Sequence, residues 1–336
     1  MTVQMNLKEN GYDIVVERGI LKKAGELLNL NRRVLVLTDS LVPSEYAKTV
    51  AKQCKDAVIC TVESGEVSKS FETLSKLMQT MLENGFSRKD CVVAVGGGVV
   101  GDLAGFAASI YMRGVDFYNI PTTLLSQIDS SIGGKTAVNF RGIKNIVGSF
   151  YQPKKVLIDS DLLKTLPERQ ISNGFAEAVK MALTSDKKLF EIIENEDIFE
   201  NIDEIIIRSL NIKKSVVEQD EKETGLRKIL NFGHTVGHGI EVTMEEHLYH
   251  GECVALGLIP MCGENIRQRV IKVLKKCNLY REPSFNWEEI KNAISHDKKA
   301  NGDSISVTVV PEVGEFEIIS VKCEELIEMA KKCLEG

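Results

Sequence analysis

Residues 32–95 alternate between short apolar runs and amphipathic segments, and this alternation limits the possible folds more than any other feature. The continuous apolar run RRVLVLTD (32–39) is typical of a strand buried on both faces. The runs DAVICTV (56–62) and DCVVAV (90–95) predict two further strands. Between them, residues 42–54 and 70–85 carry start signals or apolar spacing typical of helices. Strands alternating with helices predict a parallel sheet, with ligands at the carboxyl ends of its strands.

The residues before and after this region follow different patterns of hydrophobicity. Residues 3–16 alternate around Asn10-Gly11, which predicts a hairpin. After about residue 165 most segments have a helical period, interrupted by a strand pair at 304–310 and 315–320. We therefore expect an α/β N-terminal Rossmann-like domain with a parallel sheet (1–160) and a mostly α-helical C-terminal domain (161–336).

Composition excludes several classes of protein. With 43% hydrophobic residues, 27% charged residues and a net charge of −6, the chain resembles an ordinary globular protein without a nucleic-acid-binding tail. No apolar run reaches the roughly 18 residues that span a bilayer, and the N-terminus lacks a signal-peptide pattern. The eight cysteines form no CxxC pair, which favours free thiols in a reducing compartment. We expect a cytoplasmic protein that binds neither nucleic acid nor membranes.

The segment VAVGGGVVGDLAGFAA (93–108) predicts a strand, a glycine turn and a helix. Glycines let the backbone approach a pyrophosphate, and a helix N-terminus favours negative charge. The spacing differs from the GxGxxG dinucleotide fingerprint, so a tight turn without a ligand is the alternative. Asp102 either complements the helix dipole or accepts a hydrogen bond from a cofactor hydroxyl.

Residues 121–145 are rich in hydroxyl groups, glycine and lysine. Lys135 follows a Gly-Gly pair, and Lys144-Asn145 begins nine residues later, so the segment resembles a phosphate-binding loop without the Walker spacing. A polar surface loop is the alternative. Apolar residues within the segment argue against disorder, and we expect a long ordered loop of functional importance.

Glu177 and Lys180 lie one helical turn apart in NGFAEAVKMAL (173–183). Such a pair is ordinarily a surface ion pair. The rest of the segment is apolar, however, so the helix would partly bury both charges and each would need partners.

Four of the five histidines, His234, His238, His247 and His250, lie within residues 231–252. The i,i+4 spacing of His234 and His238 places two imidazoles on one helix face, as in metal-binding helices. His247 and His250 are i,i+3, and the preceding glutamates indicate a helix end or loop. Spacing alone favours His234 and His238 as a metal-binding pair, and leaves open that no metal binds.

A series of motifs, in this order along nearly the whole chain, resembles the 3-dehydroquinate synthase family of sugar-phosphate cyclases. The motifs are GGGVVGDLAGFAA, RGVDFYNIPTTLLSQIDSSIGGKTAVN, KNIVGSFYQP, LKTLPERQ, GFAEAVK, ETGLRKILNFGHTVGHGIE and HGECVALG. The order and spacing of so many motifs make a chance match very improbable.

The resemblance implies a dehydroquinate synthase-like fold and a carbon–oxygen lyase of the shikimate pathway, which leads to chorismate and the aromatic amino acids. That family converts 3-deoxy-D-arabino-heptulosonate 7-phosphate to 3-dehydroquinate and phosphate. The implied steps are transient oxidation by catalytic NAD, elimination of phosphate, re-reduction and intramolecular aldol closure. The implied cofactors are NAD and a divalent metal, zinc or cobalt, and the implied assembly is a homodimer.

The resemblance places the metal ligands at Glu177, His234 and His250, which replaces the pair favoured by spacing. One carboxylate and two imidazoles with an open position are typical of a catalytic rather than a structural metal site. His238 is then available to the substrate, and His247 has no role in this interpretation.

The resemblance also assigns the remaining polar motifs to the substrate and the nucleotide. The implied substrate-binding residues are Lys213 and Arg227 for the carboxylate, Asp129, Lys180 and Asn231 for hydroxyls, and Lys135, Lys144, Asn145, Arg113 and Lys298 for the phosphate and its surroundings. The implied nucleotide-binding residues are Asp39, Glu66, Lys69, Gly97, Gly98, Asp102, Thr122, Thr123, Lys135, Lys144 and Thr165. Arg113 is expected to reach in from the neighbouring subunit, and Lys299 competes with Lys298 for its role.

Two departures from the family pattern concern the phosphate segment. The family commonly reads GGKTGVN and then has a glycine before the Lys-Asn pair, where this chain has Ala137 and Ile143. The alternatives to a dehydroquinate synthase are a related cyclase acting on sedoheptulose 7-phosphate or a similar sugar phosphate, an NAD- and metal-dependent alcohol dehydrogenase, and a non-catalytic binding module. Phosphate release and net NADH accumulation separate these alternatives.

Overall fold

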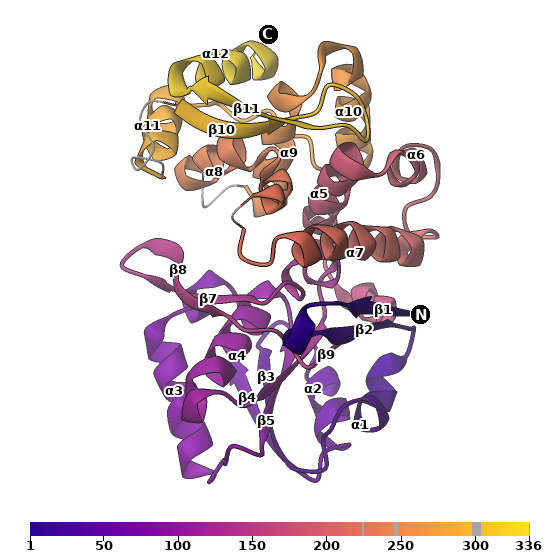
Figure 1. The fold of residues 1–336 in the computed structure, drawn as a ribbon, viewed down its shortest axis with the longest axis vertical. Coiled ribbons are helices and arrows are strands. Elements are labelled where there is room, and N and C mark those ends of the chain that lie inside the picture. Colours follow the sequence, from indigo (N-terminus) through magenta and orange to yellow (C-terminus); the bar gives the residue numbers. More distant parts are fainter. Residues whose placement is uncertain (224, 245–247, 298–303, 336) are drawn as a thin grey trace. The chain divides into compact units, whose positions relative to one another are not determined.

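The computed structural model describes residues 1–223, 225–244, 248–297 and 304–335. The chain forms two compact units, Met1–Pro167 and Glu168–Gly336 (Figure 1). The division thus falls after Pro167, a few residues beyond the boundary expected near 160. Over the described ranges, no helix combines the length and the apolar character that crossing a membrane requires.

Unit 1, Met1–Pro167, is built on a seven-stranded sheet with the strand order β1-β2-β9-β6-β5-β3-β4. Its strands are β1 (Thr2–Met5), β2 (Tyr12–Val16), β3 (Arg33–Asp39), β4 (Asp56–Val62), β5 (Cys91–Gly96), β6 (Asp116–Pro121) and β9 (Lys155–Ile158). Only the β1–β2 pair is antiparallel among these neighbours. The strands expected from the apolar runs are therefore confirmed as β3, β4 and β5.

Helices cover both faces of this sheet (Figure 1). They are α1 (Ala24–Leu27), α2 (Ser44–Ala51), α3 (Phe71–Glu83) and α4 (Gly98–Ile110). Along β3, Leu35 and Leu37 pack in one core with α3 and α4, whereas Val34 and Val36 pack in a second core with α1 and α2. Because both of its faces are buried, β3 has a continuous apolar sequence rather than an alternating one.

Residues 121–145 do not form the long loop expected from the sequence. They contain the π-helical turn η5 (Ser126–Ser130), the strand β7 (Lys135–Phe140) and the start of β8 (Ile143–Phe150). The two strands pair as an antiparallel hairpin, whose turn contains Gly142 at φ +79°. The prediction was wrong because the hairpin pattern is interrupted by a register shift between Val138 and Phe140, which hides the period of two.

The two departures from the family pattern lie in this hairpin. Ala137 pairs with Gly148 on the facing strand, and a Cβ on Gly148 would lie only 2.7 Å from the Cβ of Ala137. The small residue of this pair is thus on β8, which makes room for the alanine on β7. Ile143 begins β8 with an exposed side chain, so the hairpin accommodates both residues.

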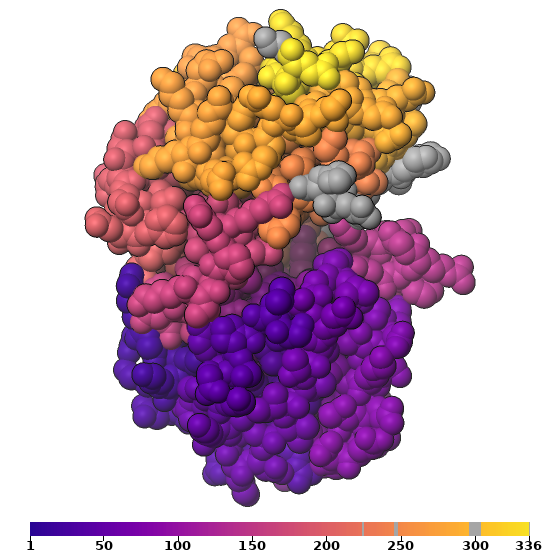
Figure 2. Space-filling model, turned by 180° about the vertical axis from the view of Figure 1, so that it is seen from behind, coloured from indigo at the N-terminus to yellow at the C-terminus, as the bar shows by residue number. Residues whose placement is uncertain are grey.

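Unit 2, Glu168–Gly336, is mostly helical, as expected. Its helices are α5 (Glu168–Ser185), α6 (Lys187–Asn195), α7 (Ile202–Gln219), α8 (His234–Thr243), α9 (His250–Leu258), α10 (Glu264–Lys276), α11 (Trp287–Asp297) and α12 (Cys323–Leu334). The strands β10 (Ser304–Val309) and β11 (Glu317–Lys322) form the expected antiparallel pair. The middle of α5 is buried, whereas α12, drawn in yellow, lies at the surface of this unit (Figure 2).

Three glycines bring α5, α8 and α9 into close contact. A side chain at Gly257 of α9 would collide with the backbone oxygen of Gly233, which precedes α8. A Cβ at Gly237 would lie 3.0 Å from the backbone oxygen of Cys253, and one at Gly251 would collide with the backbone of Asn173 on α5. This close approach places the histidine-bearing ends of α8 and α9 beside α5.

Candidate metal centre and nucleotide-binding edge

Glu177, His234 and His250 lie together in unit 2. Their donor atoms are all within 4.8 Å of one another, although the residues come from α5, α8 and α9. Oε1 of Glu177 is 3.4 Å from Nε2 of His234 and 3.6 Å from Nε2 of His250. The structure thus groups the three residues to which the resemblance assigns a metal.

The other nitrogen of each imidazole has a partner outside this group. Nδ1 of His234 lies 3.1 Å from the backbone oxygen of Phe232, and Nδ1 of His250 lies 2.9 Å from Oε2 of Glu241. Histidines that bind metals characteristically engage the second ring nitrogen in this way, which fixes the ring and its tautomer. Both rings therefore present Nε2 towards Glu177.

Glu177 carries a buried charge that the protein leaves incompletely satisfied. Its side chain is 1% exposed, and neither carboxylate oxygen has a hydrogen-bond partner within the described ranges, although Lys180 forms an ion pair with it. Burial opposes ionisation, but the charges of Lys180 and His234 and the nearby imidazole nitrogens of His234 and His250 hold the pKa of Glu177 well below its ordinary value. An ionised carboxylate of this kind is a suitable ligand for a divalent cation.

The two imidazoles differ in their electrostatic surroundings. Burial and the nearby Lys180 ammonium lower the pKa of His234. Burial also lowers the pKa of His250, but its interactions with the carboxylates of Glu177 and Glu241 outweigh burial and raise this pKa to about 9. One carboxylate and two imidazoles with these partners form a donor set that fits zinc or a similar divalent metal.

Lys180 links α5 to the turn that precedes α8. Its ammonium donates to the backbone oxygen of Leu230 at 2.6 Å, next to Asn231, and it is as buried as Glu177. The ordinary interpretation of Glu177 and Lys180 as a surface ion pair was therefore wrong. The apolar residues around them in α5 bury both charges, as the sequence allowed.

The 3-10 turn η7 (Leu226–Asn231) is held by a loop rich in charged residues. Oδ2 of Asp220 accepts from the backbone nitrogens of Gly225 at 2.7 Å and Arg227 at 3.0 Å. The buried Arg227 side chain donates to the backbone oxygen of Glu221 at 2.6 Å. The loop thus orders the residues immediately before the donor group.

A cavity of about 300 Å³ adjoins the donor group. It is lined by Lys228, Asn231, His234, Thr235, His238 and Ser304–Thr308. His238 is exposed, and its ring centroid lies 5.3 Å from that of His234. The i,i+4 pair therefore shares one face of α8, but only His234 belongs to the group that contains Glu177.

In unit 1 the residues assigned to the nucleotide gather at one edge of the sheet. Asp39 ends β3, the turn η3 (Glu66–Ser68) follows β4, Gly97 follows β5, and Thr122 follows β6. These strands are neighbours in the sheet and parallel, so their carboxyl ends share an edge. This edge is where open α/β sheets bind ligands.

The glycine turn at this edge forms a narrow cradle. Gly97 is the N-cap of α4, and a Cβ there would lie 3.0 Å from Cγ2 of Thr123. A Cβ at Gly98 would lie 3.0 Å from Oγ of Ser130. The backbone is therefore accessible only because these residues are glycine, and the backbone amides at the N-terminus of α4 fit an anionic diphosphate.

Lys69 joins several residues assigned to the nucleotide and the substrate. It is buried, forms an ion pair with Asp102 at 2.6 Å, and donates to the side chain of Asn145. Asn139 donates to Oε1 of Glu66 at 2.8 Å and accepts from the backbone nitrogen of Asn145 at 2.8 Å. The β7–β8 hairpin is thus attached to the beginning of α4.

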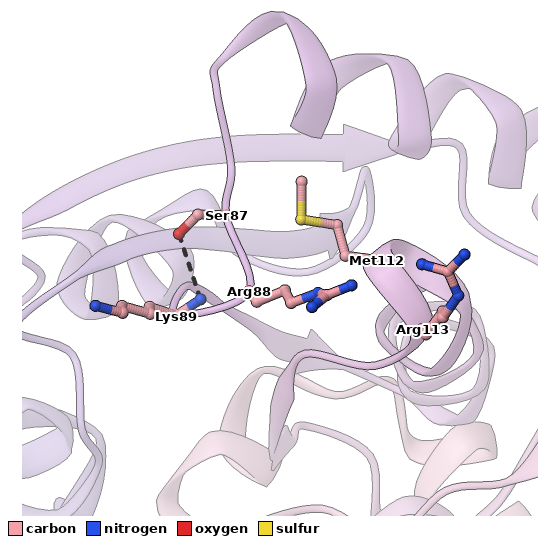
Figure 3. A pocket seen from close by; sticks show the side chains of 5 residues that line it. All are labelled: Ser87, Arg88, Lys89, Met112 and Arg113. Atoms are coloured by element: carbon pink, nitrogen blue, oxygen red, sulfur yellow. Dashed lines mark hydrogen bonds between the residues drawn. The ribbon is translucent and has the colours of Figure 1, made fainter.

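Arg113 lies away from this edge within its own unit. It belongs to the turn η4 (Tyr111–Arg113) after α4, where Met112 and Arg113 have φ of +48° and +70°. Figure 3 shows it beside Arg88 of the loop before β5, in a surface pocket that also includes Ser87, Lys89 and Met112. The length of α4, roughly 20 Å, separates this pocket from the glycine turn.

The remaining predicted residues are distributed over several elements. Asp129 lies in η5, Lys135 begins β7, Lys144 lies in β8, Lys213 is buried in α7, and Thr165 ends η6 (Ser160–Thr165). Oγ1 of Thr165 lies 2.9 Å from the Tyr46 hydroxyl. His247 and Lys298 lie outside the described residues.

The sequence interpretation gave no role to two glutamates that support the donor group. Glu241 contacts His250, and the fully buried Glu252 accepts from the side chains of Arg169 and Arg281 and from the backbone of Tyr249. Arg169 lies on α5, so Glu252 joins this helix to the start of α9. The motifs GHTVGHGIE and HGE contain both glutamates, and Glu241 follows His234 by seven residues on one helix face.

Comparison with known proteins gives consistent similarities. A family model described as 3-dehydroquinate synthase N-terminal matches residues 59–173, and one described as 3-dehydroquinate synthase C-terminal matches residues 174–300. A 3-dehydroquinate synthase from Streptococcus thermophilus is 40% identical, over 99% of this chain and 100% of that protein.

Two solved structures have the same fold. A 2-deoxy-scyllo-inosose synthase complexed with carbaglucose-6-phosphate, NAD⁺ and Co²⁺ superposes with a TM-score of 0.91 at 25% identity, covering 99% of this chain and 100% of that one. A 2-epi-5-epi-valiolone synthase from Streptomyces hygroscopicus subsp. jinggangensis 5008, with NAD⁺ and Zn²⁺ bound, has a TM-score of 0.88 at 28% identity, covering 98% of each chain.

Proposed function

We propose, from the premise that this chain belongs to the 3-dehydroquinate synthase family, that it converts 3-deoxy-D-arabino-heptulosonate 7-phosphate to 3-dehydroquinate and phosphate. The observation that carries the proposal is the grouping of Glu177, His234 and His250 in a chain with this family membership. A buried carboxylate facing two oriented imidazoles suits a metal that activates substrate hydroxyls rather than a structural metal.

We assign NAD and a divalent metal, zinc or cobalt, as the cofactors. When bound, they supply a hydride acceptor and donor and a Lewis acid for the substrate hydroxyls. Glu177, His234 and His250 would hold the metal. Residues at the carboxyl edge of the unit 1 sheet would hold the nucleotide, namely Asp39, Glu66, Lys69, Gly97, Gly98, Asp102, Thr122, Thr123, Lys135, Lys144 and Thr165.

The polar residues around the donor group have distinct roles in this proposal. Arg227 and Lys213 bind the substrate carboxylate, because cations in a mainly buried setting attract an anion strongly. Lys180 and Asn231 orient substrate hydroxyls. His238, exposed in the cavity beside His234, exchanges protons with the substrate, since an imidazole suits that task near neutral pH.

Residues of unit 1 are also assigned to the substrate. Asp129 accepts from a substrate hydroxyl, whereas Lys135, Lys144 and Asn145 bind the phosphate. Lys298, outside the described residues, is assigned to the phosphate as well. Concentrated positive charge stabilises a phosphate as it leaves. Holding an extended sugar acid by its carboxylate and phosphate also restricts its conformation, which favours the intramolecular ring closure.

We further propose that the protein is a homodimer in which Arg113 serves the phosphate of the neighbouring subunit. Two features support this assignment. Arg113 lies a helix length from the glycine turn of its own chain, and it is held in a left-handed backbone conformation on the surface, which is typical of residues under functional constraint.

The second candidate is a cyclase that acts on a different sugar phosphate, such as sedoheptulose 7-phosphate. The TM-score of 0.91 with a 2-deoxy-scyllo-inosose synthase is the observation that favours this alternative, and it concerns the fold. The 40% identity to a dehydroquinate synthase over the whole chain, against 25% to that cyclase, favours the heptulosonate phosphate.

Phosphate release by the purified protein tests the proposal. With the heptulosonate phosphate, NAD⁺ and zinc, we expect stoichiometric phosphate and 3-dehydroquinate, loss of activity with a chelator, and no net NADH. Sedoheptulose 7-phosphate serves as the matched substrate control. Phosphate release only from sedoheptulose 7-phosphate would contradict the proposal in favour of the second candidate, and accumulating NADH would indicate a dehydrogenase.

A further inference from the structure

We infer that Glu241 is a positioning residue for the metal centre, which holds the imidazole of His250 so that Nε2 faces the metal beside Glu177. The inference deepens the proposed function, since it concerns the same site. It adds the contact between Glu241 and His250, which neither the sequence interpretation nor the metal-ligand set contains.

The first support is the placement of Glu241 on α8. His234, His238 and Glu241 are related by four and three residues, so they lie on one face of the same helix. Gly237, on another face, lets α9 approach closely. As a result, Glu241 of α8 reaches His250, the first residue of α9, with Oε2 2.9 Å from Nδ1.

The second support is the division of the two ring nitrogens between two carboxylates. Nδ1 of His250 faces Glu241 at 2.9 Å, whereas Nε2 faces Glu177 at 3.6 Å. A neutral imidazole that donates its proton from Nδ1 keeps the Nε2 lone pair for a metal. Glu241 therefore selects the tautomer in which Nε2 is the ligand atom.

The third support comes from comparing the two histidines. Nδ1 of His234 is held by the backbone oxygen of Phe232 at 3.1 Å, which belongs to the fold itself. The side chain of His250 is 30% exposed, against 13% for His234, so packing restrains it less. We therefore expect His250 to depend on its carboxylate partner for a fixed orientation.

One other arrangement of the same residues is geometrically possible. His238, Glu241 and His250 also place donor atoms within 4.8 Å of one another, which would make Glu241 itself a ligand. The buried oxygens of Glu177 argue against this arrangement. They have no hydrogen-bond partner in the described part of the chain, and without a metal beside them they would be left with the ion pair to Lys180, although a buried charge needs close partners.

Zinc affinity, measured by chelator competition on the full chain, distinguishes these roles. We expect Glu241→Ala to bind zinc about 10- to 100-fold more weakly than the wild type while still taking one ion at saturation. Glu241→Gln keeps an oxygen that can accept from Nδ1, so it should lose less. Glu177→Gln, which removes a ligand, should lose the site altogether.

Glu194→Gln is the matched control. Its side chain is 23% exposed, close to the 17% of Glu241, and it pairs with Arg269 instead of a residue of the donor group. This variant should bind zinc like the wild type. The visible spectrum of the cobalt form gives a second measure, because a tilted His250 changes the ligand field only in the Glu241 variants.

Three results would overturn the inference. The first is a zinc dissociation constant for Glu241→Ala within about threefold of the wild-type value, well short of the usual effect of an outer partner. The second is complete loss of the site, as in Glu177→Gln, which would make Glu241 a ligand. The third is a large fall in the melting temperature of metal-free Glu241→Ala, which would indicate a general structural role.

These results are separable from the proposed function. A protein that binds zinc normally in the Glu241 variants but releases phosphate from the heptulosonate phosphate would contradict only the inference. A protein whose zinc affinity depends on Glu241, but which releases no phosphate, would contradict only the proposed function.

Discussion

Two lysine–carboxylate pairs, one in each unit and each with a buried lysine, differ in how completely the protein satisfies them. In unit 1, Lys69 contacts both Asp102 and the side chain of Asn145. In unit 2, Lys180 contacts Glu177 and donates to the backbone of Leu230, yet the oxygens of Glu177 have no hydrogen bond within the described ranges. The protein thus gives the first pair a further side-chain partner, whereas it leaves the carboxylate of the second pair without hydrogen bonds from the described residues.

The difference shows what kind of ligand each region is built to receive. A buried carboxylate without hydrogen bonds is unfavourable unless another cation joins it. The Glu177 region is thus built around an ion, and three helices hold its donors rigidly. In the Lys69 region, Asp102 and Asn145 pair the buried ammonium. Glycine amides and loop side chains lie at a sheet edge there, which suits a larger ligand with many weak contacts.

The largest expected effect concerns the histidines of unit 2. We expect His250→Ala to lose bound zinc and, with it, activity. His238→Ala should retain one zinc per chain but turn over about 10²- to 10⁴-fold more slowly, the usual contribution of a general acid–base group. Metal analysis and steady-state kinetics of both variants check this. If His250→Ala retained zinc, His250 would not be a metal ligand, and the Glu177 region could no longer be contrasted with the Lys69 region as the one built around an ion.

A smaller effect is expected at the Lys69 pair. In Asp102→Asn, loss of a charged hydrogen-bond acceptor should weaken NAD⁺ binding roughly 10- to 100-fold, without changing zinc affinity. Titration of NAD⁺ followed by calorimetry measures this effect, with zinc affinity as the internal control. Unchanged NAD⁺ binding would mean that Asp102 serves only the helix dipole and Lys69.

The smallest effect is expected at Asp90, a carboxylate whose contacts are purely structural. Burial raises its pKa, but hydrogen bonds from Ser87 and from the backbone of Arg33 outweigh it, so the folded-state pKa is lowered. A lowered folded pKa stabilises the protein above the unfolded value of about 3.9, and this stability is lost as pH falls through the folded pKa.

Asp90→Asn should therefore reduce the free energy of unfolding by about 1 kcal/mol at pH 7, since Asp90 is partly exposed. The difference from the wild type should shrink as the pH falls below about 4. Denaturant unfolding at pH 7 and at acid pH checks this, and neither zinc nor NAD⁺ affinity should change. A difference that grows in acid would reverse the assigned direction of the pKa shift.

Much of the fold could be predicted from the sequence, because local periodicity follows burial. The apolar runs that became β3 and β5 are buried on both faces, whereas β4 is a partly exposed edge strand. The helical period of most segments after residue 165 reflects one-sided burial. Residues 121–145 could not be predicted in this way. Their hairpin contains a register shift at Val138 and Phe140, and its stability depends on contacts with Lys69 and α4 that are distant in sequence.

The sequence by itself determined the alternation of strands and helices, the glycine turn after β5 and the region that supplies the histidines. These features depend on residues close together in the chain, and the family motifs added the ligand assignment. Only the tertiary structure decided that Glu177 faces His234 and His250, that Lys180 is buried, and that Glu241 holds His250. Spacing reports which residues share a helix face, whereas these contacts depend on how closely α5, α8 and α9 approach one another at Gly233, Gly237, Gly251 and Gly257.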